Sequence, residues 1–430
     1  MATGPSAHTP AALAGSLSRL APRRLIPFAR GHHMFKTRLR ALLHPLPGLL
    51  LLASTLMAPG LQAKEAPPAA ERWQQTLSEA RGQTVYFNAW GGSPEINAYL
   101  QWASAEIQRQ YGVKLVQVKV DDIAQSVSQL LANQQAGKKS GSPIDLLWVN
   151  GENFKALKDK QLLGAPFTGD LPNMALVDQQ LPVNQDFTVP VEGLEAPWGI
   201  GQLNLMVNEE EVGTPPTSAA ALLAWAQTHP GRFTYPKPPQ FHGSSFLKQI
   251  LLELTPDPTH LYQEATDAEF ERLSAPLWAW LDALHPALWR KGKLFPAGAA
   301  ETKQLLDDGE LAMAISFNPS EAQSSVQNGT LPPGVKAIAM AKGALTNSHF
   351  LAIPFNANAR ASALVVANFL LSPAAQARKA DVAVWGDPSV LRRDALPKGT
   401  APALRFKALA EPHPSWQLRL EAAWAARYGH

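Results

Sequence analysis

Residues 84–120 read TVYFNAWGGSPEINAYLQWASAEIQRQYGVKLVQVKV. The apolar residues 84–90 predict a buried strand, residues 91–93 a tight loop, residues 96–111 an amphipathic helix and residues 112–120 a second strand. In such a unit the loop and the helix N-terminus lie at the carboxyl end of the first strand, where open α/β sheets bind ligands. The stretch therefore predicts an α/β fold with a ligand site at this loop.

The segment before this unit has the pattern of an export signal. Residues 34–40 are basic, residues 41–57 are mainly apolar, and small residues follow up to Ala63. This order is typical of a secretory signal peptide, and the apolar run is too short and too rich in proline for a membrane span. We expect translation from Met34, cleavage near Ala63 and a periplasmic product.

Residues 1–33 have more than one interpretation. They are either an over-extended start or an extra tail, or they form one long transit segment with residues 34–63. The adjacent Arg23 and Arg24 are one feature of twin-arginine export, an alternative to the general route. In each case residues 1–63 are a leader, and the folded protein follows them.

The basic charge of the chain belongs to its leader. The whole sequence has 38 Lys and Arg against 35 Asp and Glu, a formal charge of +3. Residues 1–63 contain seven of the basic side chains and no acidic one, so residues 64–430 carry −4. This balance argues against nucleic acid as the main partner. The absence of cysteine excludes disulfides, a cysteine nucleophile, thiolate metal ligands and a lipid-modified cysteine at the cleavage point.

Strand–loop–helix units recur on both sides of residue 200. A helix over 121–135, a buried strand over 144–149 and a loop at 150–153 repeat the first unit, and a strand over 196–208 follows. Because the pattern resumes after this strand, the chain predicts two α/β lobes rather than one large sheet.

The second half contains similar units. A short strand over 232–236 precedes a loop at 242–245 and a helix over 246–254, and a strand over 312–317 ends at Asn318. The 367 residues after the leader suit two lobes of about 100–200 residues each.

Four places in the chain resemble the extracellular solute-binding proteins of ATP-binding-cassette (ABC) importers. They are VYFNAWGG at 85–92, IDLLWV at 144–149, VEGLEAPWGIGQLNLMVN at 191–208, and LDDGELAMAIS at 306–316 followed by the late segment 363–373. The chain is most similar to the branch that takes polyamines, iron, thiamine, sulfate and related solutes, and within it to a thiamine-like subfamily.

The resemblance implies a two-lobed periplasmic-binding-protein fold of type II, with a small-molecule solute in the cleft between the lobes. Lobe one would comprise residues 84–199 and 345–372, and lobe two residues 200–344 and 373–430. Hinge closure would present the protein, a monomer without a cofactor, to a membrane permease and its ATPase. The chain itself lacks the GxxxxGK[ST] phosphate loop.

Strand ends and loops supply the candidate ligand contacts. Free N–H groups at helix starts can hold an anionic or carbonyl oxygen, an acid can anchor a cation, and an aromatic ring can stack on a flat or cationic solute. On these grounds the sequence predicts contacts from Trp90, Gly91, Gly92, Ser93, Asn150, Gly151, Glu152, Trp198, Tyr235, Gly243, Ser244, Ser245, Ser316, Asn318 and Trp385.

Several candidates also have a purely structural interpretation. Ser93 would serve as a helix N-cap, and Glu152 as a solvated acid favoured in the first turn of a helix. Trp198 would plug the joint between the lobes. His349 is more simply a hydrogen-bonded structural residue than a ligand contact.

The solute class stays open. An aromatic site with one or two acids suits thiamine or a polyamine, whereas the serine-bearing loops at Ser93 and at Ser244 with Ser245 suit an oxyanion. The six Tyr include no adjacent pair of the kind that the iron-binding branch uses, and the His residues after the leader lack metal-ligand spacing. We therefore expect no metal and favour an organic solute.

Two other function classes compete with transport. A secreted, hydrolase-like enzyme would need a catalytic arrangement, and the sequence has neither GxSxG nor HExxH, although scattered Asp and Glu could form a carboxylate pair. A ligand sensor on the same fold would bind its solute identically but lack a permease partner. We expect a transport component and no enzymatic activity.

Overall fold

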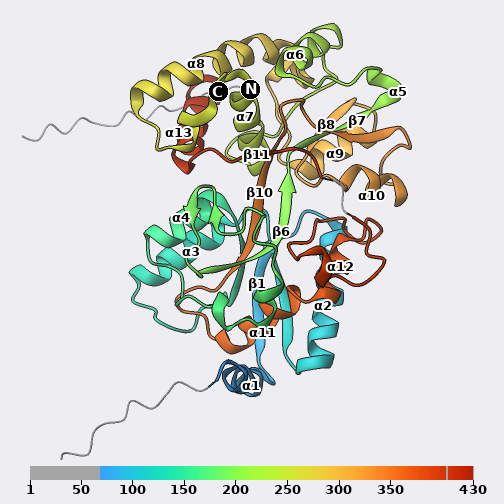
Figure 1. The fold of residues 1–430 in the computed structure, drawn as a ribbon. Helices are drawn as coiled ribbons and strands as arrows, with labels where there is room; N and C mark the ends of the chain where they lie inside the picture. The colour runs from blue at the N-terminus through green and yellow to red at the C-terminus, as the bar shows by residue number, and fades with distance from the viewer. Residues whose placement is uncertain (1–67, 403–404, 430) are drawn as a thin grey trace, which may run out of the picture. The chain divides into compact units, whose positions relative to one another are not determined.

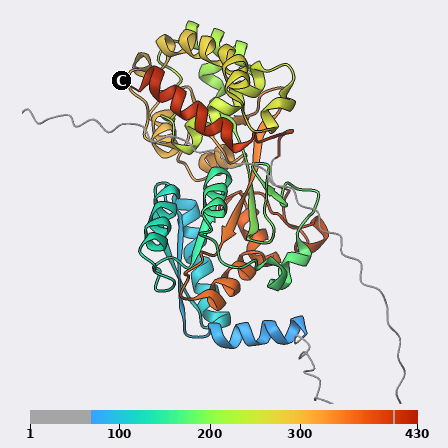
Figure 2. The ribbon, with the colours of Figure 1, turned by 90° about the vertical axis from the view of Figure 1, so that its left-hand side faces the viewer.

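The computed structural model describes residues 68–402 and 405–429. The predicted leader, residues 1–63, lies outside these ranges. The described residues belong to one packed unit. Within it, two lobes each have their own sheet and helices, and the strands β6 and β10 run between them (Figures 1 and 2).

The first lobe is built on a six-stranded sheet. Its order is β11-β10-β3-β1-β2, and β6 pairs with β10 off this path. Neighbours β1, β2 and β3 are parallel, whereas β10 runs antiparallel to β3 and β6. The strands are β1 (Thr84–Trp90), β2 (Lys114–Val120), β3 (Leu146–Val149), β6 (Glu195–Gln202), β10 (Ala344–Ala352) and β11 (Ala408–Ala410).

The predicted opening unit is confirmed. β1 and β2 pair in parallel along their whole length, joined by helix α2 (Pro94–Tyr111). The Ser93 hydroxyl accepts a hydrogen bond from the Ile96 N–H at 3.3 Å and starts α2, and Gly112 ends it in the left-handed conformation with φ of 69°. The strand end and the helix start therefore meet at residues 90–93.

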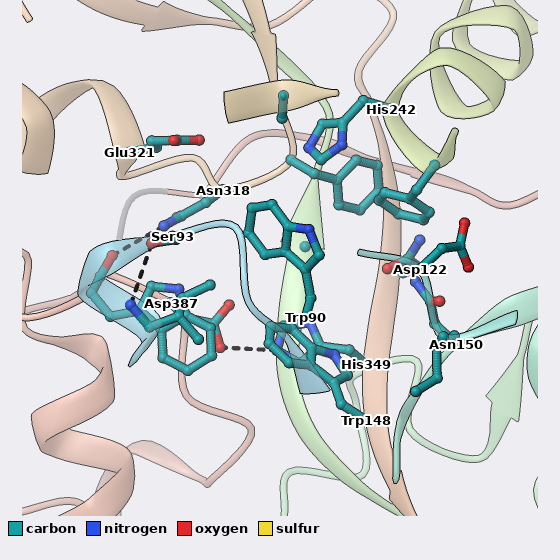
Figure 3. A pocket seen from close by; sticks show the side chains of 18 of the residues that line it. Trp90, Ser93, Asp122, Trp148, Asn150, His242, Asn318, Glu321, His349 and Asp387 are labelled. Carbon is teal, nitrogen blue, oxygen red and sulfur yellow. Dashed lines mark hydrogen bonds and ion pairs between the residues drawn. The ribbon is translucent and has the colours of Figure 1, made fainter. Parts of the chain in front are cut away.

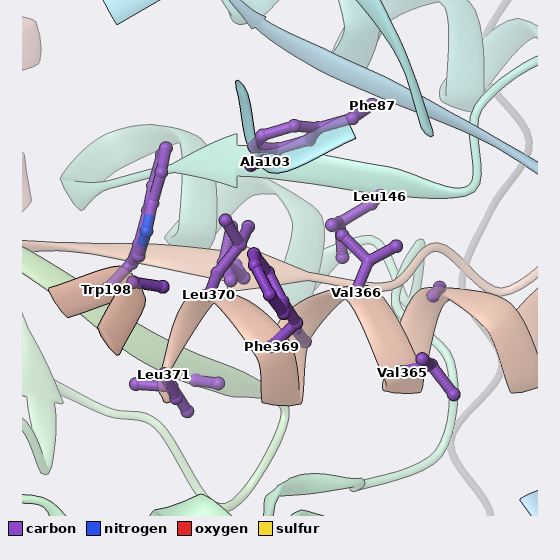
Figure 4. Close-up of a cluster of buried hydrophobic side chains, with 14 of the residues drawn as sticks. Phe87, Ala103, Leu146, Trp198, Val365, Val366, Phe369, Leu370 and Leu371 are labelled. Atoms are coloured by element: carbon purple, nitrogen blue, oxygen red, sulfur yellow. The ribbon is translucent and has the colours of Figure 1, made fainter. Parts of the chain in front are cut away.

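Helices α2 and α11 pack on this sheet in the first hydrophobic core, and α3 and α4 pack on it in a separate cluster. Trp198, Phe87 and Leu146 pack against Phe369 and Leu370 of the late helix α11 (Figure 4). The helices of this lobe are α1 (Ala69–Ala80), α2, α3 (Ala124–Gln135), α4 (Gly151–Asp159), α11 (Arg360–Leu370) and α12 (Pro373–Ala380). The core fixes the strands whose ends form the site.

The second lobe has a three-stranded antiparallel sheet of order β8-β7-β9. Its strands are β7 (Asn204–Asn208), β8 (Met313–Ser316) and β9 (Val335–Ile338). Its helices are α5 (Glu209–Val212), α6 (Ala219–Thr228), α7 (Phe241–Leu254), α8 (Asp267–Leu284), α9 (Ala299–Asp307), α10 (Glu321–Gln327) and α13 (Pro414–Tyr428). The short strands β4 (Gln185–Asp186) and β5 (Val189–Pro190) form a separate pair.

The chain passes between the lobes along β6 and β10. Ile200, near the end of β6, lies in the first core, and Leu203, just after β6, already belongs to the second core. Strand β10 runs the other way, from Leu345 in the second core to Leu351 in the first. These strands, with β11 beside the start of β10, connect the two lobes.

Several local predictions differ from the structure. Residues 232–236 form no strand, and the predicted loop at 242–245 is the first turn of α7. This helix begins early because the Gln240 side chain accepts hydrogen bonds from the N–H groups of His242 and Gly243, at 2.8 and 3.3 Å. Of residues 373–430, predicted for the second lobe, Ala375 and Leu391 pack in the first core, whereas Trp416 and Trp424 do pack in the second.

Candidate solute-binding cleft

A cleft lies between the lobes and is lined by both. From the first lobe come the ends of β1 and β3 and the starts of α2 and α4, and from the second come the start of α7 and the residues after β8. The lining residues are Trp90, Ser93, Glu95, Ile96, Asp121, Asp122, Ile123, Trp148, Asn150, Glu152, Asn153, Gly201, Gln240, Phe241, His242, Ala299, Phe317, Asn318, Glu321, Ser324, Ser325, Asn347, His349, Trp385 and Asp387.

Aromatic rings form much of the cleft wall. The rings of His349 and Trp385 stack with centroids 6.2 Å apart, and Trp148 contacts His349 at 5.1 Å. Trp90 lies at the centre of the labelled side chains in Figure 3, and its ring centroid is 6.5 Å from that of His242 on the second lobe. Such faces suit a flat or cationic solute.

Polar contacts also connect the two sides of the cleft. The side-chain amide of Asn318, which follows β8, donates to the backbone carbonyl of Trp385 at 3.0 Å. On the first lobe, the Ser93 hydroxyl donates to Glu95 at 2.6 Å while it caps α2. Ser93 therefore has its predicted structural role and also lines the cleft.

The charged side chains of the cleft are acidic. Among the described residues that line it, six are carboxylates and none is Lys or Arg. In the view of Figure 3, Glu321 and Asp387 lie on one side of Trp90 and Asp122 lies on the other. Burial lowers the pKa of His242 to about 4, so this imidazole is neutral near pH 7 and adds no positive charge.

Asp387 is paired with the Lys379 ammonium and contacts the His349 ring, and we call Asp387, His349 and Lys379 the Asp387 triad. Its carboxylate lies 3.1 Å from His349 Nε2 and contacts the fully buried Lys379 ammonium. Burial by itself raises the pKa of this carboxyl, but His349 and Lys379 outweigh that effect and hold the pKa below its ordinary value. The acid is thus ionised and already paired.

Glu152 differs from Asp387. Its Oε1 accepts from the Asn153 side-chain amide at 3.3 Å, while its Oε2 is buried and accepts no hydrogen bond from the described residues. Burial raises the pKa of Glu152 to about 7, against the opposing effect of the Lys248 charge. Glu152 thus lines the cleft with a buried carboxyl whose Oε2 has no hydrogen-bond donor among the described residues.

Six of the predicted contacts line the cleft: Trp90, Ser93, Asn150, Glu152, Asn318 and Trp385. They come from different segments, so the fold brings the predicted strand ends together. The remaining predicted residues do not line it: Gly91, Gly92, Gly151, Trp198, Tyr235, Gly243, Ser244, Ser245 and Ser316.

Of those nine residues, Gly91 is half-buried and Gly92 is exposed, whereas the other seven are buried: Gly151, Trp198, Tyr235, Gly243, Ser244, Ser245 and Ser316. Trp198 is fully buried in the core of the first lobe rather than at the joint between the lobes, and the Tyr235 hydroxyl is held by His285 and Trp424 at 2.8 Å each. Ser244 donates to Glu421 at 2.6 Å. A side chain at Gly243 would collide with the carbonyl of Pro236, so this glycine allows the start of α7 to pack closely.

The sequence prediction missed several lining residues. Phe241 and His242 enter the cleft because α7 begins five residues before the predicted helix start. Asp121 and Asp122 follow the carboxyl end of β2, the same signal that selected Trp90 and Asn150. Asp387 has no such local signal, since its partners His349 and Lys379 belong to β10 and α12.

Two α/β lobes joined by crossing strands, with a cleft lined by both, define the periplasmic-binding-protein class of solute-capturing proteins. This chain belongs to the bacterial extracellular solute-binding protein family, whose sequence profile matches residues 102–393. The predicted two-lobed fold is thereby confirmed, and the family is one of binding proteins rather than of enzymes.

Individual proteins resemble this chain in sequence or in fold. The chain is 48% identical to protein YnjB of Escherichia coli strain K12 over 367 residues, which cover 84% of this chain and 95% of that protein. The crystal structure of an ABC transporter protein from Rhodopseudomonas palustris matches with a TM-score of 0.57 at 16% identity, covering 80% and 100% of the two chains. The spermidine/putrescine substrate-binding protein PotD of Streptococcus pneumoniae matches with a TM-score of 0.53 at 16% identity, covering 81% and 96%.

Two further features of the described residues bear on the sequence predictions. No helix among them combines the length and hydrophobicity that a membrane span requires. No group of three or more His, Asp or Glu among them is placed to hold a metal ion. The family is extracellular, which agrees with export, while cleavage near Ala63 remains a prediction.

Proposed function

We propose that this protein captures a small organic cation in the interlobe cleft, closes around it and delivers it to a membrane permease driven by an ATPase. The observation that carries the proposal is the composition of the cleft lining: six carboxylates and several aromatic rings, with no Lys or Arg among the described lining residues. A cation gains from both kinds of group, whereas an anion would meet like charge.

The connections between the lobes support a hinge mechanism. The chain crosses near Leu203 and along β10, whose two ends belong to different cores. Small changes at such crossings move whole lobes, and a solute that contacts both lobes favours the closed arrangement. Trp90 and His242, from opposite lobes, are placed to enclose a solute between them.

The position of the serines disfavours an oxyanion. Ser244 and Ser245, which made one of the two predicted oxyanion loops, lie within α7 and do not line the cleft. Ser93 remains, but it lies beside Glu95. We therefore favour the thiamine-like or polyamine-like alternatives, the second of which is also the solute class in the name of PotD.

A thermal-shift screen tests this function. The protein from Lys64 onward is melted with thiamine, spermidine, choline, sulfate, succinate, ferric ion, amino acids and sugars. A solute at about 100 times its dissociation constant adds about 2.7 kcal/mol of stability. One strong hit is expected, with a matching compaction in small-angle scattering. Silence across the panel would contradict the proposed function.

A further inference from the structure

We propose that the Glu152 carboxylate recognises the cationic centre of the solute, and that the solute replaces a proton which Glu152 holds while the cleft is empty. This inference rests on the proposed function and assigns the charge selectivity of that cleft to one residue. It also makes solute capture depend on pH.

The start of α4 places Glu152 in the cleft lining. The Gly151 N–H donates to Asp186 Oδ2 at 2.6 Å, which anchors the first turn of the helix beside the β4 strand. Gly151 has φ of 55°, and a side chain there would collide with the Phe187 ring, so the turn is closely fitted. Glu152 is therefore held at the cleft by a rigid turn, with its Oε2 unpartnered among the described residues.

Glu152 belongs to a group of acidic side chains from several elements. Asp186 in β4 and Glu421 on α13 interact with Glu152 directly, and Glu411, just after β11, interacts with Asp186. All four carboxyls lie around Lys248 of α7. We call these four carboxyls the interlobe acid cluster. Gln417 of α13 and Ser244 of α7 are its neutral hydrogen-bonding members.

The single positive charge of Lys248 cannot neutralise all four carboxyls of the cluster. Its ammonium lies 2.8 Å from Glu411, donates to Gln417 at 2.8 Å and sits 4.1 Å from the centre of the Phe187 ring. Four ionised carboxylates around this one cation would carry a charge of −3. Burial accordingly raises the pKa of each of the four, and that of Glu152 to about 7.

Glu152 is the member of this cluster that lines the cleft. Asp186, Glu411, Glu421 and Lys248 do not line the cleft, whereas Glu152 does. A cation in the cleft therefore supplies, at Glu152, the positive charge that the cluster lacks. Without the solute, a proton on Glu152 supplies it below about pH 7.

The exchange predicts the direction of the pH effect. Below about pH 7 the solute must displace the Glu152 proton, so its apparent affinity falls by up to about tenfold for each further pH unit. Between pH 8 and pH 5 the apparent affinity should fall by about 100-fold. A carboxylate that only caps α4 would produce no such dependence.

Calorimetric titration with thiamine, spermidine, choline, sulfate, succinate and glucose at pH 5, 6, 7 and 8 tests the inference. The proteins are the wild type, Glu152→Gln and the control Glu192→Gln, which removes an acid whose side chain is 62% exposed and lies outside the cleft. We expect a cation to bind the wild type and the control with the predicted pH slope. Glu152→Gln should bind it at all four pH values as weakly as the wild type does at pH 5.

The outcomes separate this inference from the proposed function. If the solute that binds is an anion or neutral, or if Glu152→Gln keeps the wild-type affinity and slope, the role of Glu152 is wrong while the binding function stands. If no solute binds any of the proteins, the proposed function itself fails. If Glu152→Gln does not fold, the affinity of the wild type measured against pH still tests the inference. A cation that binds the wild type with the same affinity at all four pH values would show that the solute does not replace a proton on Glu152.

Discussion

The Asp387 triad and the interlobe acid cluster are both buried beside the same cleft, yet their charges are arranged in opposite ways. In the triad one carboxylate is shared by Lys379 and His349. In the cluster four carboxyls surround Lys248. The pKa of Asp387 is accordingly lowered by its neighbours, while burial raises the pKa of Glu152.

This difference in charge indicates a structural role for the triad and a ligand-binding role for the cluster. A buried ion pair whose members satisfy each other holds its surroundings in place but offers little to a ligand. A buried acid without a cation is destabilising until a proton or a ligand arrives. The triad therefore braces the aromatic wall of His349 and Trp385, and the cluster contributes the selective group.

Breaking the triad should have the largest effect on stability. Lys379→Met preserves much of the side-chain volume but leaves Asp387 buried without its ammonium partner. Removing one member of such a pair costs about 3–5 kcal/mol. Urea unfolding measures it, with Lys155→Met as control, because the more exposed Lys155–Asp159 pair should contribute less than about 1 kcal/mol. If Lys379→Met loses no more unfolding free energy than Lys155→Met does, the triad does not stabilise the fold.

Neutralising Glu152 in the interlobe acid cluster should stabilise the protein, whereas breaking the triad should destabilise it. The folded-state pKa of Glu152 is about 7, above its ordinary value of 4.5, so the folded protein binds the proton more tightly than the unfolded chain does. Wild-type stability therefore decreases as pH rises from 4.5 to 7, by at most about 3 kcal/mol from this group.

The introduced glutamine side chain of the Glu152→Gln variant cannot ionise, so this variant does not lose stability in this way as the pH rises. Its stability relative to wild type should increase between pH 4.5 and pH 8, as measured by urea unfolding at both values, while Glu192→Gln shows no such trend. If the stability difference between Glu152→Gln and wild type is the same at both pH values, the raised pKa is not a property of the folded protein.

Removing the central ring should weaken binding and leave the fold intact. Trp90 is only partly buried and packs at the edge of the first core, so Trp90→Ala should lower solute affinity by about 10- to 100-fold through lost stacking. The control Trp289→Ala removes a partly buried ring that does not line the cleft. Equal affinities of Trp90→Ala and wild type for the solute found by calorimetry would remove Trp90 from the site.

The sequence predicted those site residues that lie directly at the ends of strands. Trp90, Asn150 and Asn318 were each predicted because a buried strand stops there, and the sheet then brings them to one cleft. The opening strand–helix–strand unit was equally predictable, since its apolar period, its serine cap and its glycine stop all agree.

The unpredictable part depends on contacts between distant segments. His349 reaches Asp387 because β10 pairs with β6 and β3, a register that no local pattern specifies. Likewise, Lys248, Glu152 and Glu411 are far apart in the chain and meet only where the lobes join. A side-chain cap at Gln240 moved the start of α7 and so replaced the predicted Ser244 and Ser245 by Phe241 and His242.

The smallest expected effect distinguishes the two roles of Ser93. Its hydroxyl caps α2, so Ser93→Ala should cost about 1 kcal/mol of stability whether or not the solute touches it. Ser218→Ala is the matched control, because Ser218 caps α6 in the same way and does not line the cleft. Urea unfolding should give similar losses for both variants. Because Ser93 also orients Glu95 in the cleft, calorimetry should show a few-fold weaker binding for Ser93→Ala alone. Equal affinities of the two variants would reduce Ser93 to a helix cap and leave charge selection to Glu152.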